Sequence, residues 1–182
     1  EPQQPFADFL RKTLPSEIVF IEAAAGEKES EVEMSVSTKH PTVSSLKADF
    51  ISSASSKPGF EKVRWDRTQL VKVVTLDGLI QSHGTPNYIK IDVEGFELEV
   101  LKGLSQPIEM ISCEVLPGFP ELSIEVLYRI SELGKYEFNL VVGEGAKFLW
   151  SDWKNQKAVR DWIENQSPKT KPADLFARLI SD

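Results

Sequence analysis

The apolar pattern of the chain changes its period near the middle, between residues 87 and 104. Residues 88–93 form a short apolar run, which predicts a β-strand. The next apolar positions recur at helical spacing and predict an amphipathic helix: Phe96, Val100, Leu101 and Leu104. Asp92, Glu94 and Gly95 lie between these elements, at the carboxyl end of the strand, where open α/β sheets hold their ligand crevice. We therefore expect the functional chemistry at this junction.

The two carboxylates at the junction also have a structural interpretation. Asp92 and Glu94 stand just ahead of the helix, where an acidic side chain caps free N–H groups and complements the helix dipole. As an isolated motif, this arrangement does not separate a helix cap from a catalytic acid. Both interpretations stay open at this point.

The rest of the chain alternates between strand-like and helix-like patterns. Alternating or β-branched runs predict strands over residues 18–21, 32–36, 63–74, 107–115, 138–142 and 173–180. Amphipathic spacing predicts helices over residues 6–14, 75–80, 122–133 and 153–163, with Thr75 as an N-cap. Residues 37–62 are rich in Ser, Lys, Pro and Gly and predict a long loop. This order is typical of an α/β fold.

The strand patterns also suggest an arrangement of the sheet, which we expect to be mostly parallel. Residues 88–93 are predicted to be a central strand, because their apolar run is almost continuous. Residues 173–180 carry Asp174 and Arg178 and are predicted to pair antiparallel near an edge.

Composition narrows the class of protein. A chain of 182 residues with 41% hydrophobic content can bury one substantial core, so we expect residues 1–182 to form a single domain. The net charge of −7 argues against a nucleic-acid partner, which would favour a basic patch. The single cysteine, Cys113, cannot form an internal disulfide, and there is neither a long apolar run nor a signal-peptide pattern. These features predict a cytoplasmic protein without a membrane partner.

One run of residues resembles the signature of a known family. Residues 89–97 read IKIDVEGFE and residues 100–103 read VLKG, which closely resembles the FkbM family of S-adenosylmethionine-dependent methyltransferases. The resemblance covers essentially the whole chain, including residues 174–178 near its end. It implies a Rossmann-like class I methyltransferase fold, with a mostly parallel sheet and a C-terminal antiparallel strand. The chain opens on Glu1 and lacks the glycine-rich cofactor loop of such enzymes, so we expect the N-terminal βα unit to be missing.

The resemblance also implies a set of cofactor contacts. The family has an acid-proline pair that binds the ribose hydroxyls, and Glu1 stands in that place. Ala23 and Ala24 stand where small residues let the adenine lie against the backbone, while Glu22 replaces an Asn that is common in the family. Asp92 is assigned both to the S-adenosylmethionine site and to catalysis. Without the glycine-rich loop, the chain as given is expected to bind the cofactor weakly and to be inactive.

The implied reaction is methyl transfer from S-adenosylmethionine to an oxygen, with a small-molecule or carbohydrate hydroxyl as acceptor. The candidate bases are Asp92 first, Glu94 second and Glu114 third. A His that the family often places two residues after that last Glu is absent, since Leu116 occupies the position. No spacing of residues is typical of a metal site. Two alternatives remain: a catalytically silent binding module with this fold, and another nucleotide-binding α/β enzyme.

Overall fold

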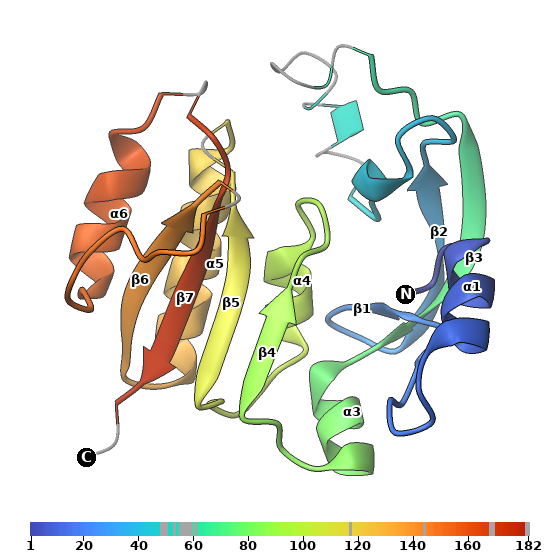
Figure 1. The fold of residues 1–182 in the computed structure, drawn as a ribbon, viewed down its shortest axis with the longest axis horizontal. Coiled ribbons are helices and arrows are strands. Elements are labelled where there is room, and N and C mark those ends of the chain that lie inside the picture. The colour runs from blue at the N-terminus through green and yellow to red at the C-terminus, as the bar shows by residue number, and fades with distance from the viewer. Residues whose placement is uncertain are drawn as a thin grey trace.

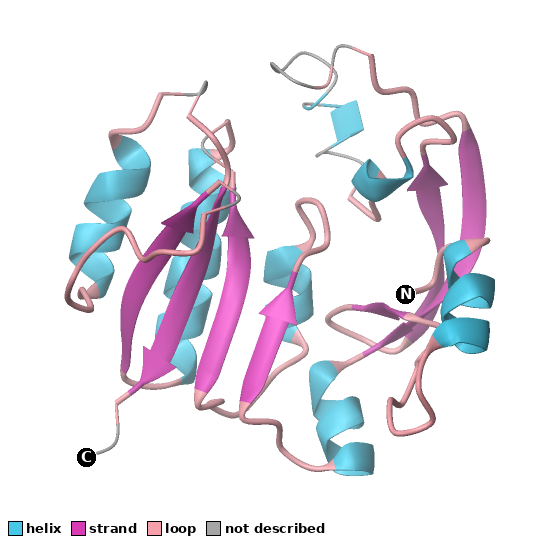
Figure 2. Cartoon of the chain, in the orientation of Figure 1, coloured by secondary structure: helices cyan, strands magenta, loops and turns pink. Residues whose placement is uncertain are grey.

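The strands in the described part of this chain form two sheets (Figure 1). The computed structural model describes residues 1–47, 51, 52, 54, 60, 62–116, 118–143, 145–167 and 170–180. The helices and strands alternate along most of the chain (Figure 2), which confirms the predicted α/β class. None of the helices among these residues is both long and apolar enough to cross a membrane.

The first sheet has three strands in the order β1-β3-β2. Its strands are β1 (Ala24–Ala25), β2 (Ser30–Val36) and β3 (Arg67–Val74), and β3 pairs parallel with β1 and antiparallel with β2. The apolar positions of β2 alternate as predicted, and Met34 and Val36 pack with Val71 and Val73 of β3 in a small core. Helix α1 (Phe6–Thr13) and the short 3-10 helix η1 (Pro41–Val43) belong to this half of the molecule.

The second sheet has four strands in the order β4-β5-β7-β6. Its strands are β4 (Tyr88–Ile91), β5 (Met110–Val115), β6 (Tyr136–Val142) and β7 (Ala173–Leu179). The helices of this half are α3 (Leu76–His83), α4 (Glu97–Lys102), α5 (Pro120–Leu133) and α6 (Gln156–Glu164). Together these elements bury the main core, whose largest fully buried side chains include Leu101, Ile111, Leu127, Phe138, Leu140 and Leu175. The thiol of Cys113 lies free within this core.

Several local predictions are confirmed. Thr75 caps α3, because its hydroxyl oxygen accepts a hydrogen bond of 3.0 Å from the Gly78 N–H. Helices α5 and α6 lie where the spacing of their apolar residues predicted them, and β7 pairs antiparallel with its neighbours. The predicted long loop begins after β2 and contains η1, and much of its second half lies outside the described residues.

The predicted sheet arrangement is wrong in three respects. Three of the five strand pairs are antiparallel, so the sheets are mixed rather than mostly parallel. Among the described strands, β4 lies at a sheet edge instead of the centre, since it pairs with β5 on one side, and its Tyr88 and Lys90 are exposed. β7 lies between β5 and β6, because the charges of Asp174 and Arg178 are paired on one face while its alternate residues are buried.

Residues 18–21 do not form the predicted strand. Ile18 and Val19 are exposed to 52% and 64%, and the first strand consists of Ala24 and Ala25 alone. β-branched residues favour a strand only when a neighbouring strand pairs with them. The extended segment instead lines a cavity that is described below.

A close backbone approach joins the two halves. A Cβ atom on Gly103, which follows α4, would lie far inside van der Waals contact with the carbonyl oxygen of Gly26, which follows β1. The Gly103 carbonyl also accepts a 2.9 Å hydrogen bond from the Asp77 N–H, while the Asp77 carboxylate accepts one from the Ser105 N–H. The position requires glycine because no side chain fits between these backbones.

We predict that Gly103→Ala destabilises the protein by about 1–3 kcal/mol, the usual cost of overpacking a rigid contact. The clashing atom belongs to the backbone of Gly26 and cannot rotate away. Chemical denaturation measures the change in the free energy of unfolding. Gly118→Ala is the control, because an added Cβ there meets nothing within 4 Å, and equal stability of the two variants would contradict the account.

Candidate active site

The site is built on the turn between β4 and α4. Two successive residues in this turn have left-handed backbone conformations, Glu94 with φ 53° and Gly95 with φ 87°. A non-glycine residue in this region costs on the order of 1–3 kcal/mol and persists only when its surroundings enforce it. The Glu97 side chain, which is 2% exposed, provides that enforcement: one carboxylate oxygen accepts the N–H groups of Val93 at 3.3 Å and Gly95 at 3.1 Å.

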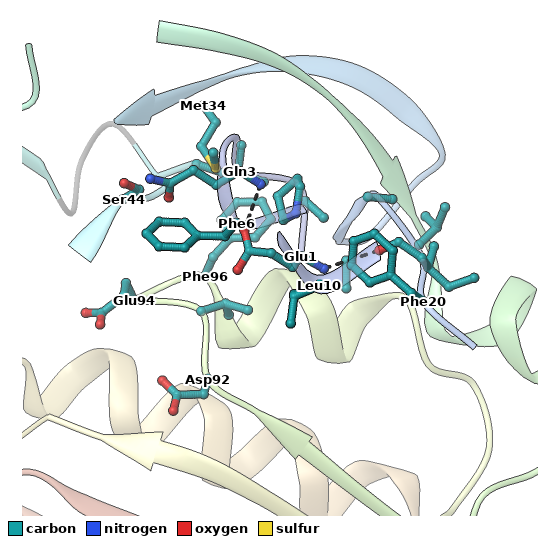
Figure 3. Close-up of a pocket in the computed structure, with 18 of the residues that line it drawn as sticks. Glu1, Gln3, Phe6, Leu10, Phe20, Met34, Ser44, Asp92, Glu94 and Phe96 are labelled. Carbon is teal, nitrogen blue, oxygen red and sulfur yellow. Dashed lines mark hydrogen bonds between the residues drawn. The ribbon is translucent and has the colours of Figure 1, made fainter. Parts of the chain in front are cut away.

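A large cavity opens beside this turn, between the two sheets (Figure 3). Its volume is about 880 Å³, within the range of sites for cofactors and small molecules. Most of the lining is apolar. The polar side chains on it include Glu1, Gln3, Ser44, Ser45, Asp92 and Glu94. The arrangement of few polar groups in a mainly apolar hollow is typical of a ligand site.

The structure brings five of the predicted site residues to this cavity. Ala23 and Ala24 belong to its lining, as do Glu1 of the N-terminal segment and Asp92 and Glu94 of the turn after β4. Figure 3 shows Glu1, Asp92 and Glu94. The sixth residue, Glu114, is not part of the lining. It lies near the end of β5, opposite Asp174 of β7 in the register of the sheet.

The carboxylates of this region repel one another. Burial raises the pKa of Glu94 to about 7, and the charges of Asp92 and Glu97 add to the effect. Burial likewise raises the pKa of Glu114 to about 8, and among the neighbouring charges Glu94 and then Asp92 add most to the effect. One oxygen of Glu114 is buried and accepts no hydrogen bond from the described residues, which makes its ionised form costly. Because its pKa is about 7, Glu94 exchanges a proton near neutral pH.

Asp92 differs from its neighbours because it has a cationic partner. Its carboxylate lies 3.2 Å from the ammonium group of Lys90, which also lies 3.7 Å from Asp174. The Asp92 and Lys90 side chains are about half exposed. The hydrogen bond to Asp92 raises the pKa of Lys90, so this cation persists beside the site. The Lys90 ammonium group therefore lies against the Asp92 carboxylate, whereas no ion pair is found for Glu94 among the described residues.

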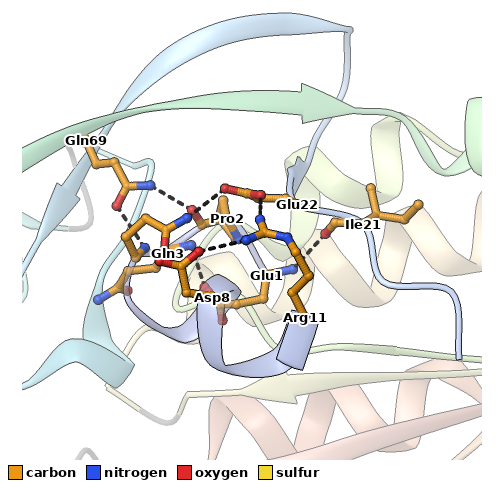
Figure 4. A network of polar contacts seen from close by, with 9 residues as sticks. Glu1, Pro2, Gln3, Asp8, Arg11, Ile21, Glu22 and Gln69 are labelled. Atoms are coloured by element: carbon orange, nitrogen blue, oxygen red, sulfur yellow. Dashed lines mark hydrogen bonds and ion pairs between the residues drawn. The ribbon is translucent and has the colours of Figure 1, made fainter. Parts of the chain in front are cut away.

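A polar network fixes the N-terminal wall of the cavity (Figure 4). Arg11 of α1 pairs with Asp8 at 2.7 Å and with Glu22, so the Glu22 carboxylate points away from the cavity. Gln69 of β3 donates a 2.7 Å hydrogen bond to the Pro2 carbonyl. One carboxylate oxygen of Glu1 accepts the Gln3 N–H at 2.7 Å, which orients this side chain along the cavity wall.

Sequence reasoning missed the apolar wall opposite the turn. It consists of residues from α1 and the extended segment that follows: Phe6, Phe9, Leu10, Ile18, Val19 and Phe20. Their helical and β-branched spacing predicts a helix and a strand but no cavity wall. Among the described residues Phe9, Ile18 and Val19 remain more than half exposed, which no periodic pattern reports. Sequence reasoning also gave no contact between Ser45 and the turn, because that contact joins segments 49 residues apart.

The sequence itself identifies the family. The model of the family described as "Methyltransferase FkbM domain" matches residues 1–167. The chain belongs to the FkbM methyltransferase family. It is also similar to the hexuronic acid methyltransferase AglP of Haloferax volcanii, with 38% identity over 56 residues. That alignment covers 30% of this chain and 23% of the relative, so the chain matches only a small part of that protein. No solved structure matches the chain.

The cavity of this FkbM domain fits the chemical groups of S-adenosylmethionine. The Glu1 carboxylate could accept hydrogen bonds from ribose hydroxyls, and the small side chains of Ala23 and Ala24 would leave room for a flat ring against the backbone. The negative charges of Asp92 and Glu94 suit a sulfonium cation. Among the described residues, no group of three or more His, Cys, Asp or Glu is arranged to hold a metal ion.

We predict that the stability of the protein falls as the pH rises from about 5 to about 8.5. The folded pKa values of Glu94 and Glu114, about 7 and about 8, lie above the ordinary value of 4.5. The folded state therefore binds more protons than the unfolded state in this range, and ionisation of the two groups weakens it. Chemical denaturation across the range measures the slope of the free energy of unfolding against pH.

The matched control is the double variant Glu94→Gln, Glu114→Gln, which has no proton to lose at either position. Its stability is expected to fall less steeply with pH than that of the wild type, and Glu97, whose pKa burial also raises, contributes to the slope that remains. A wild-type stability that rises with pH, or an unchanged slope in the double variant, would contradict the raised pKa values.

Proposed function

We propose that this FkbM domain transfers a methyl group from S-adenosylmethionine to a hydroxyl oxygen of a sugar or secondary metabolite. The observation that carries the proposal is the meeting of Glu1, Ala23, Asp92 and Glu94 at one cavity of about 880 Å³. The similarity to the Haloferax hexuronic acid methyltransferase supports a uronic acid or related sugar as the acceptor class. We further propose a Rossmann-like arrangement of this domain.

Different residues of the cavity would contact different parts of the cofactor. Glu1 would accept hydrogen bonds from the ribose hydroxyls, and Ala23 with Ala24 would contact the adenine. Asp92, held by Lys90, would supply a fixed negative charge beside the sulfonium group. When bound, S-adenosylmethionine would supply an electrophilic methyl group on its sulfur.

We assign the proton-accepting function to Glu94. Its pKa of about 7 matches the requirement for a base that works near neutral pH, whereas the Asp92 carboxylate is engaged by Lys90. The Glu94 carboxylate would take the proton of the acceptor hydroxyl as the oxygen forms its bond to the methyl carbon. This order reverses the sequence-based preference for Asp92. Glu114 lies outside the cavity lining, and the charge of Glu94 contributes to its raised pKa.

We predict that Glu94→Gln in the full protein lowers turnover by about 10²–10⁴ while the affinity for S-adenosylmethionine changes little. The amide keeps the size of the side chain but cannot take up the proton. Transfer of labelled methyl groups to hexuronic acids and their oligosaccharides measures turnover, and calorimetric titration measures cofactor affinity. In the wild type, the rate should rise with pH through about 7.

Two companion variants sharpen the result. Glu125→Gln removes an exposed carboxylate on α5, remote from the cavity lining, and should leave turnover unchanged. Asp92→Asn should weaken cofactor binding more than it slows the proton transfer. Near-normal turnover in Glu94→Gln together with loss in Asp92→Asn would return the base to Asp92.

A further inference from the structure

The loop between β2 and β3 touches the active-site turn through Ser45. This residue lies in a described part of the loop and is 2% exposed. Its backbone pairs with Ser35 of β2 in an antiparallel bridge, with hydrogen bonds of 3.0 and 3.1 Å. Its side chain therefore extends from a fixed backbone, anchored in the first sheet, toward the turn that follows the second sheet's edge strand.

The hydroxyl of Ser45 has a defined orientation. The Lys47 N–H donates to its oxygen at 3.1 Å, and the hydroxyl donates its own proton to the Glu94 carbonyl at 3.0 Å. A serine hydroxyl has one proton to give. That proton is therefore committed to the backbone of the residue whose φ is 53°.

A second contact joins the same two segments. The Lys47 ammonium lies 3.5 Å from a carboxylate oxygen of Glu99, in the first turn of α4, and both side chains are largely buried. Ser45 and Lys47 thus place the loop on both ends of the stretch that carries Glu94 and Glu97. Glu97 holds the turn from within the second half of the molecule, and Ser45 holds it from the first half.

We infer that Ser45 is a positioning residue that keeps Glu94 in its left-handed conformation and so aims the Glu94 carboxylate into the cavity. The Glu94 carbonyl and the Gly95 N–H belong to one planar peptide unit. Glu97 holds this unit at its N–H, and the Ser45 hydroxyl holds it at its carbonyl oxygen, so the unit is fixed at both ends. Because Ser45 and Leu46 line the cavity too, the contact also sets the distance between its walls.

The consequence for catalysis rests on the proposed function, but the consequence for Glu94 does not. If the Ser45 contact is lost, the turn can relax and the Glu94 carboxylate can reach solvent. Burial is the largest cause of its raised pKa, while Asp92 and Glu97 are the charges that contribute. The titration of Glu94 therefore reports its position whether or not a methyl group is transferred.

The test is Ser45→Ala in the full chain, with the titration of Glu94 followed by carbon NMR and assigned by its loss in Glu94→Gln. We expect the midpoint to fall from about 7 toward the ordinary value of 4.5. Turnover should fall by about 10–100-fold, the cost of misplacing a reacting group, with little change in cofactor affinity.

Ser37→Ala is the matched control. Ser37 is fully buried in the same loop, and its hydroxyl accepts the His40 N–H at 3.3 Å without touching the turn. This variant should keep the wild-type midpoint. If Ser45→Ala does not fold, Ser45→Cys is measured instead, because its thiol fills the same space with a weaker donor.

The outcomes separate this inference from the proposed function. An unchanged Glu94 midpoint in the Ser45 variant, or an equal shift in Ser37→Ala, overturns the positioning of Glu94 by Ser45. If the Glu94 midpoint shifts in Ser45→Ala but neither the wild type nor any variant transfers a methyl group, the positioning is supported and the proposed reaction is rejected. A shifted midpoint with reduced turnover in Ser45→Ala alone supports both.

Discussion

The buried carboxylate of Glu97 is the constraint on which the site depends. Its oxygen satisfies two backbone N–H groups in a turn that would otherwise leave them unpaired, and this permits the left-handed sequence of Glu94 and Gly95. The cost is electrostatic, because a third negative charge is confined near Asp92 and Glu94. The interaction that shapes the turn is thus also one of the causes of the proton affinity of Glu94.

The cavity exists because the two halves of the molecule meet at few points. Gly103 and Gly26 bring the backbones together at one place, and Ser45 with Lys47 brings the loop to α4 at another. Between these contacts the described side chains leave a hollow of about 880 Å³. One side of it is the turn after β4, and another is helix α1, which Arg11 and its ion-pair partners hold in place.

Local features of this fold could be predicted from the sequence. The junction of strand and helix at residues 87–104, the Thr75 cap and the helix before Gly134 each depend on neighbouring residues, and the structure confirms them. The lateral order of the strands could not be predicted, because pairing is decided by distant segments. The apolar run before Asp92 suggested a central strand, yet the exposed Tyr88 and Lys90 belong to an edge.

The same division holds for the candidate site. The signature run identified Asp92 and Glu94, and the resemblance carried Glu1, Ala23 and Ala24 to positions that the structure brings to one cavity. The ranking of the acids could not be read from the sequence, since it depends on burial and on the Lys90 partner. The Ser45 contact was likewise hidden, because no local pattern records which backbone carbonyl a distant hydroxyl will reach.

Because Cys113 is buried, the reactivity of its thiol reports how often the second sheet opens. The thiol is the only one in the sequence, it has no exposed surface, and burial raises its pKa well above the ordinary value. A thiolate is the reactive form, so a thiol reagent is excluded both sterically and chemically while β5 is paired on both sides. The rate of labelling would therefore count the excursions in which the second sheet comes apart, leaving motions of the cavity walls unrecorded.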